Sequence, residues 1–200
     1  MSKQKYRIGI LGMQGAIAEH ADHLHHLGHE SVLIKNKEML EEIDALIIPG
    51  GESTAIWRLM RKNNLIEAVQ QFAHSQKPIF GTCAGLVLLG KDQAEAEEST
   101  KLGLMDIQIK RNGFGRQKDS FEADLTVKGM EEPYPAIFIR APYIEAAGEN
   151  VAVLATYDNK IVAAREDNLL VAAFHPELTD DTRFLELFLE MVEEKTVSPV

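Results

Sequence analysis

The first half of the chain alternates short apolar runs with segments of helical periodicity, and this pattern limits the folds available to it. The apolar runs, which we interpret as strands, cover residues 7–13, 31–34, 45–48 and 78–81, and the helical patterns cover residues 16–27, 54–73 and 84–89. Such alternation produces βαβ units, whose strands form a mainly parallel sheet with helices on both faces. Functional sites in these folds lie at the carboxyl ends of the strands. Three glycine-bearing turns, at residues 12–15, 50–51 and 81–85, are expected there.

The second half has a different pattern. Residues 91–101 are polar and acid-rich, which predicts an exposed loop. Strand-like runs follow at residues 104–109, 121–127, 136–140, 151–157, 161–164 and 169–174, and we expect them to extend the sheet with antiparallel strands. A final helix is predicted from Asp180, as its N-cap, to about Glu194.

Size and charge exclude several classes of protein. A chain of 200 residues that is 45% hydrophobic suffices for one domain, which we place at residues 1–200. The net charge is −10 and the basic residues are scattered, so we expect neither nucleic acid nor a membrane as a partner. The apolar stretch at residues 8–13 is too short for a signal peptide, and no stretch approaches a membrane span. A single cysteine precludes an internal disulfide, which favours a cytoplasmic location.

That cysteine, Cys83, lies in a Gly-x-Cys-x-Gly turn between two apolar runs. This pattern is typical of a nucleophile elbow, in which glycines permit a sharp turn from strand to helix. At the helix N-terminus the helix dipole favours thiolate over thiol. A lone cysteine is more often a small buried hydrophobic residue, so the assignment depends on finding its partners.

A base and its orienting group are indicated at the end of the last predicted strand. His175 follows residues 169–174 directly, and Pro176 and Glu177 come next. If the chain stays extended through Pro176, alternate side chains share a face, which places the Glu177 carboxylate beside the His175 imidazole. Glu177 would then hold the ring in the required tautomer, as the carboxylate of a catalytic triad does.

Acyl transfer also needs donors for an oxyanion. In an elbow one donor is the backbone N–H after the nucleophile, here that of Ala84. The second is expected from the Gly50–Gly51 turn, because a diglycine lets backbone N–H groups turn toward a ligand. The alternative for this turn is a simple strand end followed by a helix cap at Ser53 or Thr54.

Histidines crowd the first predicted helix and its end, at positions 20, 23, 25, 26 and 29. Pairs such as His20 with His23 have ligand spacing, but no carboxylate or cysteine completes a metal site. The apolar stripe of this helix, which should face the core, consists of Ile17, Ala21, Leu24 and Leu27. We therefore expect most of the histidines on the solvated face and no metal.

Three segments, PGGES at residues 49–53, GTCAG at 81–85 and FHPE at 174–177, resemble in this order the motifs of the class I glutamine amidotransferase family. Segments at residues 11–15, 102–106, 111–117, 120–124, 138–142 and 175–181 are similar, within that family, to the glutaminase subunits of pyridoxal 5′-phosphate synthases. The resemblance covers nearly the whole chain.

The resemblance implies a flavodoxin-like, three-layer α/β domain with a mixed, mainly parallel sheet. Cys83 would attack L-glutamine to form a γ-glutamyl thioester and release ammonia, with His175 as base and acid and Glu177 as its orienter. The residues implied to hold glutamine are Gly51, Glu52, Ser53, Arg111, Ile139 and Arg140, and those implied at the oxyanion are Gly51, Ala84 and Gln14. A guanidinium fork also suits the α-carboxylate of the substrate.

The resemblance further implies no cofactor, and a tunnel that carries ammonia to a separate synthase subunit in a large hetero-oligomer. Two alternatives stay open at this point. The chain could serve another synthase, such as that of histidine or purine biosynthesis. It could also be a regulatory module that has kept the fold without the chemistry.

Overall fold

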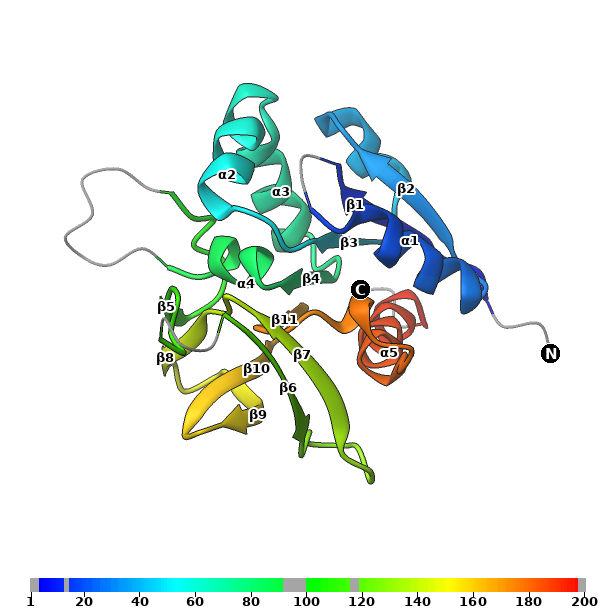
Figure 1. Cartoon of the computed structure of the whole chain (residues 1–200). Helices are drawn as coiled ribbons and strands as arrows, with labels where there is room; N and C mark the ends of the chain where they lie inside the picture. The colour runs from blue at the N-terminus through cyan, green and yellow to red at the C-terminus, as the bar shows by residue number, and fades with distance from the viewer. Residues whose placement is uncertain (1–3, 13–14, 92–99, 116–118, 198–200) are drawn as a thin grey trace.

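The computed structural model describes residues 4–12, 15–91, 100–115 and 119–197 (Figure 1). Within these residues the main sheet has nine strands, eight of them in the order β2-β1-β3-β4-β11-β10-β8-β5; the ninth, β9, lies off this path and pairs with β10. The five parallel strands are β2 (Glu30–Ile34), β1 (Arg7–Leu11), β3 (Ala45–Ile48), β4 (Ile79–Thr82) and β11 (Leu169–Ala172). The antiparallel strands are β10 (Lys160–Glu166), β8 (Tyr143–Ala147), β5 (Ile107–Lys110) and β9 (Ala152–Tyr157).

The helices lie on both faces of the sheet because its central strands are apolar on both sides. Strands β3, β4 and β11 are buried throughout, as strands of a covered parallel sheet should be. In β4, Phe80 packs on Phe184 and Phe188 of α5 (Arg183–Val197), whereas the adjacent Gly81 lies against α4 (Ala84–Leu89). Successive strand residues point to opposite faces, so α4 and α5 cover opposite sides.

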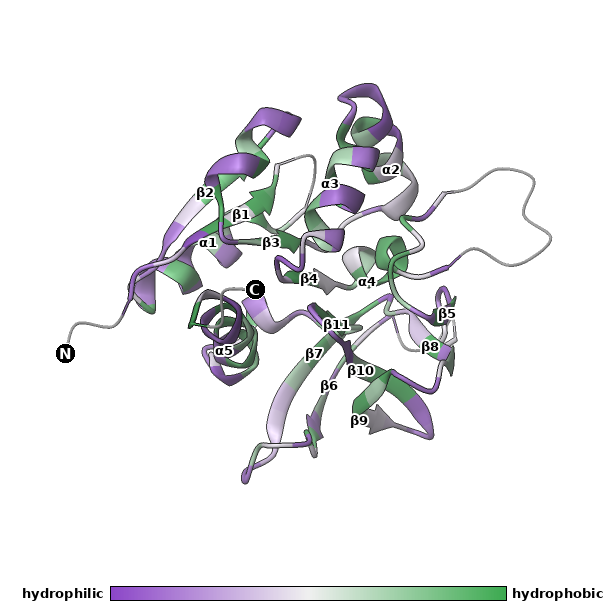
Figure 2. Ribbon diagram, turned by 180° about the vertical axis from the view of Figure 1, so that it is seen from behind, coloured by the Kyte–Doolittle hydropathy of each residue, from purple (hydrophilic) through white to green (hydrophobic). Residues whose placement is uncertain are grey.

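The other helices complete the two outer layers. Helix α1 (Ile17–His26) packs on β1 and β2, and α2 (Ser53–Lys62) contacts both α3 (Leu65–His74) and α4. Figure 2 shows apolar residues along the central strands and α4, with polar residues on the outer surfaces of α1, α2 and α3. This is the three-layer, flavodoxin-like α/β arrangement that the family resemblance implied. No helix in the described part of the chain is long and apolar enough to cross a membrane.

Several predicted elements differ from the structure. Residues 54–73 do not form one helix, because Asn64 adopts a left-handed conformation (φ 56°) that separates α2 from α3. Strands β6 (Ser120–Leu125) and β7 (Tyr134–Ile139) do not extend the main sheet but form an antiparallel pair of their own. The last helix begins at Arg183, three residues after its predicted start, and ends at Val197.

Other elements were not predicted at all. Strand β8 and the 3-10 helix η1 (Lys37–Glu42) are additional to the predicted set. Most of the acid-rich stretch at residues 91–101 falls outside the described residues.

Candidate active site

Cys83 occupies the turn between β4 and α4 in a backbone conformation that is unusual for a residue with a side chain. Its φ is 50° and its ψ is −101°, a region that costs about 1–3 kcal/mol when it is not occupied by glycine. Its N–H donates to the carbonyl of Ala172 at the end of β11, at 2.8 Å. The strand ends thus hold the strained turn, and Cys83 is 9% exposed.

The two glycines of the elbow are required by close packing rather than by their own backbone angles. A Cβ at Gly85 would collide with the backbone carbonyl of Ile48 in β3, and a Cβ at Gly81 would lie 2.7 Å from the carbonyl of Gly85. Both glycines therefore let α4 lie directly on the sheet. The turn is sharp, as the sequence predicted, and the unfavourable backbone angles belong to Cys83 itself.

His175 and Glu177 form a buried pair. Nδ1 of His175 lies 2.7 Å from Oε1 of Glu177, and Glu177 is 4% exposed. The contact agrees with the sequence prediction, but the predicted backbone is wrong: residues Pro176–Leu178 form a 3-10 turn, η2, instead of continuing the strand. Proline is favoured at the first position of a helical turn, where its missing N–H is not needed.

Packing around the preceding residue fixes the backbone of His175. Phe174 is fully buried and makes edge contacts with Phe184, at a centroid distance of 5.1 Å, and with Phe138 of β7, at 5.6 Å. The N–H of His175 donates to the carbonyl of Ile137 in β7 at 2.8 Å. The separate β6–β7 pair thus supports the proposed base.

The pair favours a charged imidazole. Burial opposes protonation of His175, but hydrogen bonds with Cys83 and Glu177 and the charges of both partners raise its pKa to about 10. Burial alone would raise the pKa of Glu177. The hydrogen bond from His175 and the nearby histidines outweigh this effect, and the pKa of Glu177 is lowered. Because Nδ1 is engaged by Glu177, Nε2 is the atom left for Cys83. The arrangement is suited to a thiolate–imidazolium pair supported by a carboxylate.

The Gly50–Gly51 turn lies directly against these groups. A Cβ on Gly50 would be 2.6 Å from Cε1 of His175 and 3.3 Å from Cβ of Cys83. Gly51 has φ 150°, which only glycine adopts readily. Ala84, the first residue of α4, is buried beside Cys83. The structure therefore brings both predicted oxyanion segments to the thiol, whereas Gln14 lies outside the described residues.

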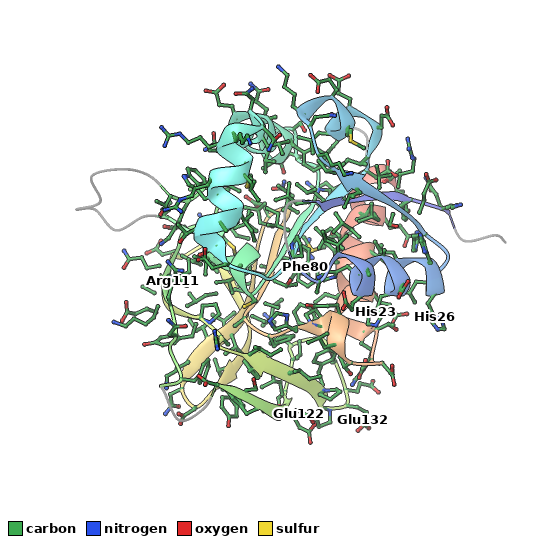
Figure 3. The ribbon with its side chains drawn as sticks, turned by 45° about the horizontal axis from the view of Figure 1, so that its top comes forward. His23, His26, Phe80, Arg111, Glu122 and Glu132 are labelled. Atoms are coloured by element: carbon green, nitrogen blue, oxygen red, sulfur yellow. The ribbon has the colours of Figure 1, made fainter. Side chains whose placement is uncertain are left out.

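The residues implied to hold glutamine occupy the rim of this site. Glu52 caps α2 by accepting the N–H groups of Thr54 and Ala55, at 3.1 and 2.8 Å, and Arg111 reaches it at 3.3 Å between Nη2 and Oε1. Both side chains are more than half exposed, and Figure 3 shows Arg111 near the start of α2. Ser53, in contrast, is buried.

The end of β7 forms the opposite part of the rim. The carbonyl of Ile139 accepts from Sγ of Cys83 at 3.9 Å. Arg140 adopts φ 44°, and its N–H donates to the carbonyl of Asp119. Of the two arginines, Arg111 is thus engaged with Glu52, while Arg140 is held through its backbone.

His20 was missed by the sequence interpretation, which placed most histidines of α1 on the solvated face. It is 2% exposed, and its Nε2 lies 3.6 Å from Oε2 of Glu177. A signal was present, because His20 stands three residues after Ile17 and four before Leu24, on the same helical stripe. His29 is buried too, stacked on Tyr6. No group of metal-ligating side chains occurs among the residues that the structure describes.

Comparison with known proteins identifies the family and several similar members of it. The model of the SNO glutamine amidotransferase family matches residues 10–194. The chain is 59% identical over 187 residues to the pyridoxal 5′-phosphate synthase subunit PdxT of Oceanobacillus iheyensis, covering 94% of each chain. It is 53% identical over 188 residues to the protein of the same name from Brevibacillus brevis, covering 94% of this chain and 98% of that one.

Solved structures of similar fold include a glutamine amidotransferase. A crystal structure of a glutamine amidotransferase superposes with a TM-score of 0.88 at 41% identity, covering 93% of this chain and 98% of the other. A putative GMP synthase component from Thermoplasma acidophilum, with a TM-score of 0.67 and 12% identity over 96% of this chain and 94% of its own, shares the fold alone. The match to the family model spans nearly the whole chain and includes all three residues of the Cys83, His175 and Glu177 arrangement. The chain belongs to the SNO glutamine amidotransferase family.

Proposed function

We propose that this chain hydrolyses L-glutamine to L-glutamate and ammonia, and that the ammonia is delivered to a synthase subunit that makes pyridoxal 5′-phosphate. The observation that carries the chemistry is the buried pair of His175 and Glu177, 2.7 Å apart, beside a strained Cys83. The relatives that are more than half identical to this chain are named as pyridoxal 5′-phosphate synthase subunits. Histidine or purine synthesis has no comparable support, since the GMP synthase likeness extends to the fold only.

In the first half of the reaction the thiolate of Cys83 adds to the side-chain carboxamide carbon of glutamine. The negative charge that develops on the carbonyl oxygen would be stabilised by the N–H of Ala84 and by the Gly50–Gly51 turn. The imidazolium of His175 gives its proton to the departing nitrogen, so ammonia leaves and a γ-glutamyl thioester remains.

In the second half neutral His175 removes a proton from water, which attacks the thioester carbonyl. The carbon–sulfur bond breaks, glutamate forms, and the thiolate–imidazolium pair is restored. Glu177 keeps Nδ1 protonated in both halves, so that Nε2 alone exchanges the proton. No metal or cofactor is required for these steps.

The exposed rim would bind the amino acid portion of glutamine. Arg111 and Arg140 each offer a planar fork of donors that suits the α-carboxylate, and Glu52 offers a carboxylate to the α-ammonium group. The Glu52–Arg111 pair is more than half exposed, so rearranging it around a substrate costs little. Gly51, Ser53 and Ile139 would contribute backbone contacts.

Glutamine hydrolysis and the synthesis of pyridoxal 5′-phosphate would take place on separate subunits. Ammonia released beside Cys83 would reach the partner through a tunnel, within a large hetero-oligomer, before water protonates it. A cytoplasmic location remains a prediction from the single cysteine.

Replacing the thiol tests whether Cys83 is the nucleophile of glutamine hydrolysis. We expect Cys83→Ala to abolish ammonia release from glutamine, measured with a pyridoxal 5′-phosphate synthase subunit present, while leaving the fold and partner binding intact. In the wild type, 6-diazo-5-oxonorleucine should label Cys83, and mass spectrometry identifies the site without ambiguity because the chain has one cysteine. Near-normal activity of the variant, or an adduct elsewhere, would exclude the mechanism. Wild-type protein that releases no ammonia with any synthase would favour the regulatory module.

A further inference from the structure

His20 faces the outer side of the Glu177 carboxylate. Helix α1, which carries it, packs against η2, which carries Glu177. Nε2 of His20 and Oε2 of Glu177 are 3.6 Å apart, and the two side chains are 2% and 0% exposed. Neither atom has a hydrogen-bond partner within the described part of the chain.

Buried polar atoms without partners are rare and costly, and here two of them face each other. Neutral imidazole carries its proton on only one nitrogen. With the proton on Nδ1, a lone pair on Nε2 would face a carboxylate oxygen, and the two acceptors would repel. With the proton on Nε2, an approach of about 0.5 Å completes a hydrogen bond of ordinary length. The geometry therefore favours the Nε2–H tautomer.

Burial keeps His20 neutral, and two neighbouring histidines assist. Burial lowers its pKa below the ordinary value, and the imidazolium of His175 and the neighbouring His23 act in the same direction. Glu177 and Glu19 oppose this effect without overcoming it. A neutral donor satisfies Oε2 of Glu177 without placing a second full positive charge beside His175.

We propose that His20 is a positioning residue, whose Nε2–H donates to Oε2 of Glu177 and so keeps Oε1 directed at Nδ1 of His175. A carboxylate that is held through one oxygen turns easily about its terminal torsion, whose energy profile is broad. A second donor on the opposite oxygen fixes that rotation, as outer partners of metal-binding histidines do. The effect of His20 on catalysis rests on the proposed glutaminase function, but its tautomer and its contact with Glu177 do not.

Two substitutions separate hydrogen bonding from packing. His20→Leu fills much of the space and removes the donor, whereas His20→Gln places an amide N–H near the position of Nε2. We expect His20→Leu to lower kcat about 10- to 100-fold with little change in KM, and His20→Gln to restore most of the rate. Loss of the donor raises the pKa of Glu177, so the acid limb of kcat/KM should move to higher pH in the leucine variant only. His26→Leu is the matched control, because His26 lies on the exposed side of α1 (Figure 3).

Two measurements do not depend on turnover. Nitrogen-15 NMR of the full-length wild-type chain should show His20 as the Nε2–H tautomer. Alkylation of Cys83 by iodoacetamide, followed against pH, should show the same shift of the acid limb in His20→Leu. The proposal is overturned by an Nδ1–H tautomer, by equal losses in the leucine and glutamine variants, or by a leucine variant that matches the wild type. Absence of ammonia release from the wild type would instead refute the proposed function, and the NMR and alkylation results would still test the contact.

Discussion

Replacing Glu177 by glutamine tests how much of the reactivity of this site comes from one buried carboxylate. The substitution keeps the size of the side chain and leaves an amide oxygen that can still accept from Nδ1 of His175, where the present contact is 2.7 Å. It removes the negative charge that stabilises the imidazolium. We therefore expect glutamine binding to persist and kcat to fall.

The order of magnitude of the fall follows from the pKa of His175. Partners raise this pKa from 6.5 to about 10 against the effect of burial, and each pKa unit is a factor of ten in the stability of the imidazolium. If Glu177 supplied the whole net increase, its loss would cost about 3 × 10³-fold. Cys83 shares in the effect, so we expect a loss of roughly 10- to 10³-fold, which is smaller than the roughly 10⁴-fold loss when a serine-protease triad loses its carboxylate.

Ammonia release with a saturating synthase subunit gives kcat and KM, and alkylation of Cys83 against pH gives the fraction of thiolate. Glu132→Gln is the matched control, since Glu132 is an exposed residue beyond β6 (Figure 3). In Glu177→Gln the imidazolium should be lost at a lower pH than in the wild type, because its folded-state pKa has fallen toward 6.5. A kinetically silent Glu177→Gln would show that Glu177 is only a turn residue and would refute the triad.

The remaining predictions concern the base and the partner. His175→Asn should lose nearly all turnover, because the proton must both leave the thiol and reach the departing ammonia, and ammonia release that stays within a few fold of the wild type would identify another base. Titration of the synthase subunit should raise the glutaminase kcat by roughly 10- to 100-fold if the free chain holds a competent oxyanion site about 1–10% of the time. An unchanged kcat at saturating partner would refute this gating while leaving the glutaminase assignment intact.

The parallel part of the fold was predictable because its strands carry an unambiguous signal. Strands β3, β4 and β11 are buried along their whole length, so their sequences are apolar except for Thr82 at the end of β4. Strand β8 gave no such signal, since Ile144 is its one fully buried residue. The division of residues 54–73 had a cue in Asn63 and Asn64, because asparagine tolerates the left-handed conformation that Asn64 adopts.

Local sequence patterns do not predict which distant segments pair with each other. Alternating side chains marked β6 and β7 as strands, but only tertiary packing decides that they pair with each other and support His175 from Ile137. The His175–Glu177 contact was predicted from extended geometry and arises from a 3-10 turn instead. His20 was missed because only the apolar residues of the first helix were used to define its buried face.

The proposed oxyanion turn and the residue that supports the proposed base both contact the start of α1. Gly15 has φ 106°, and a Cβ there would collide with the carbonyl of Gly50. Gly50 in turn lies against Cys83 and His175, while α1 begins two residues after Gly15 and carries His20 to Glu177. A small movement of this segment would therefore change the oxyanion donors and the support of the base at once. Since both act mainly in the transition state, a partner that fixes the segment should alter kcat more than KM.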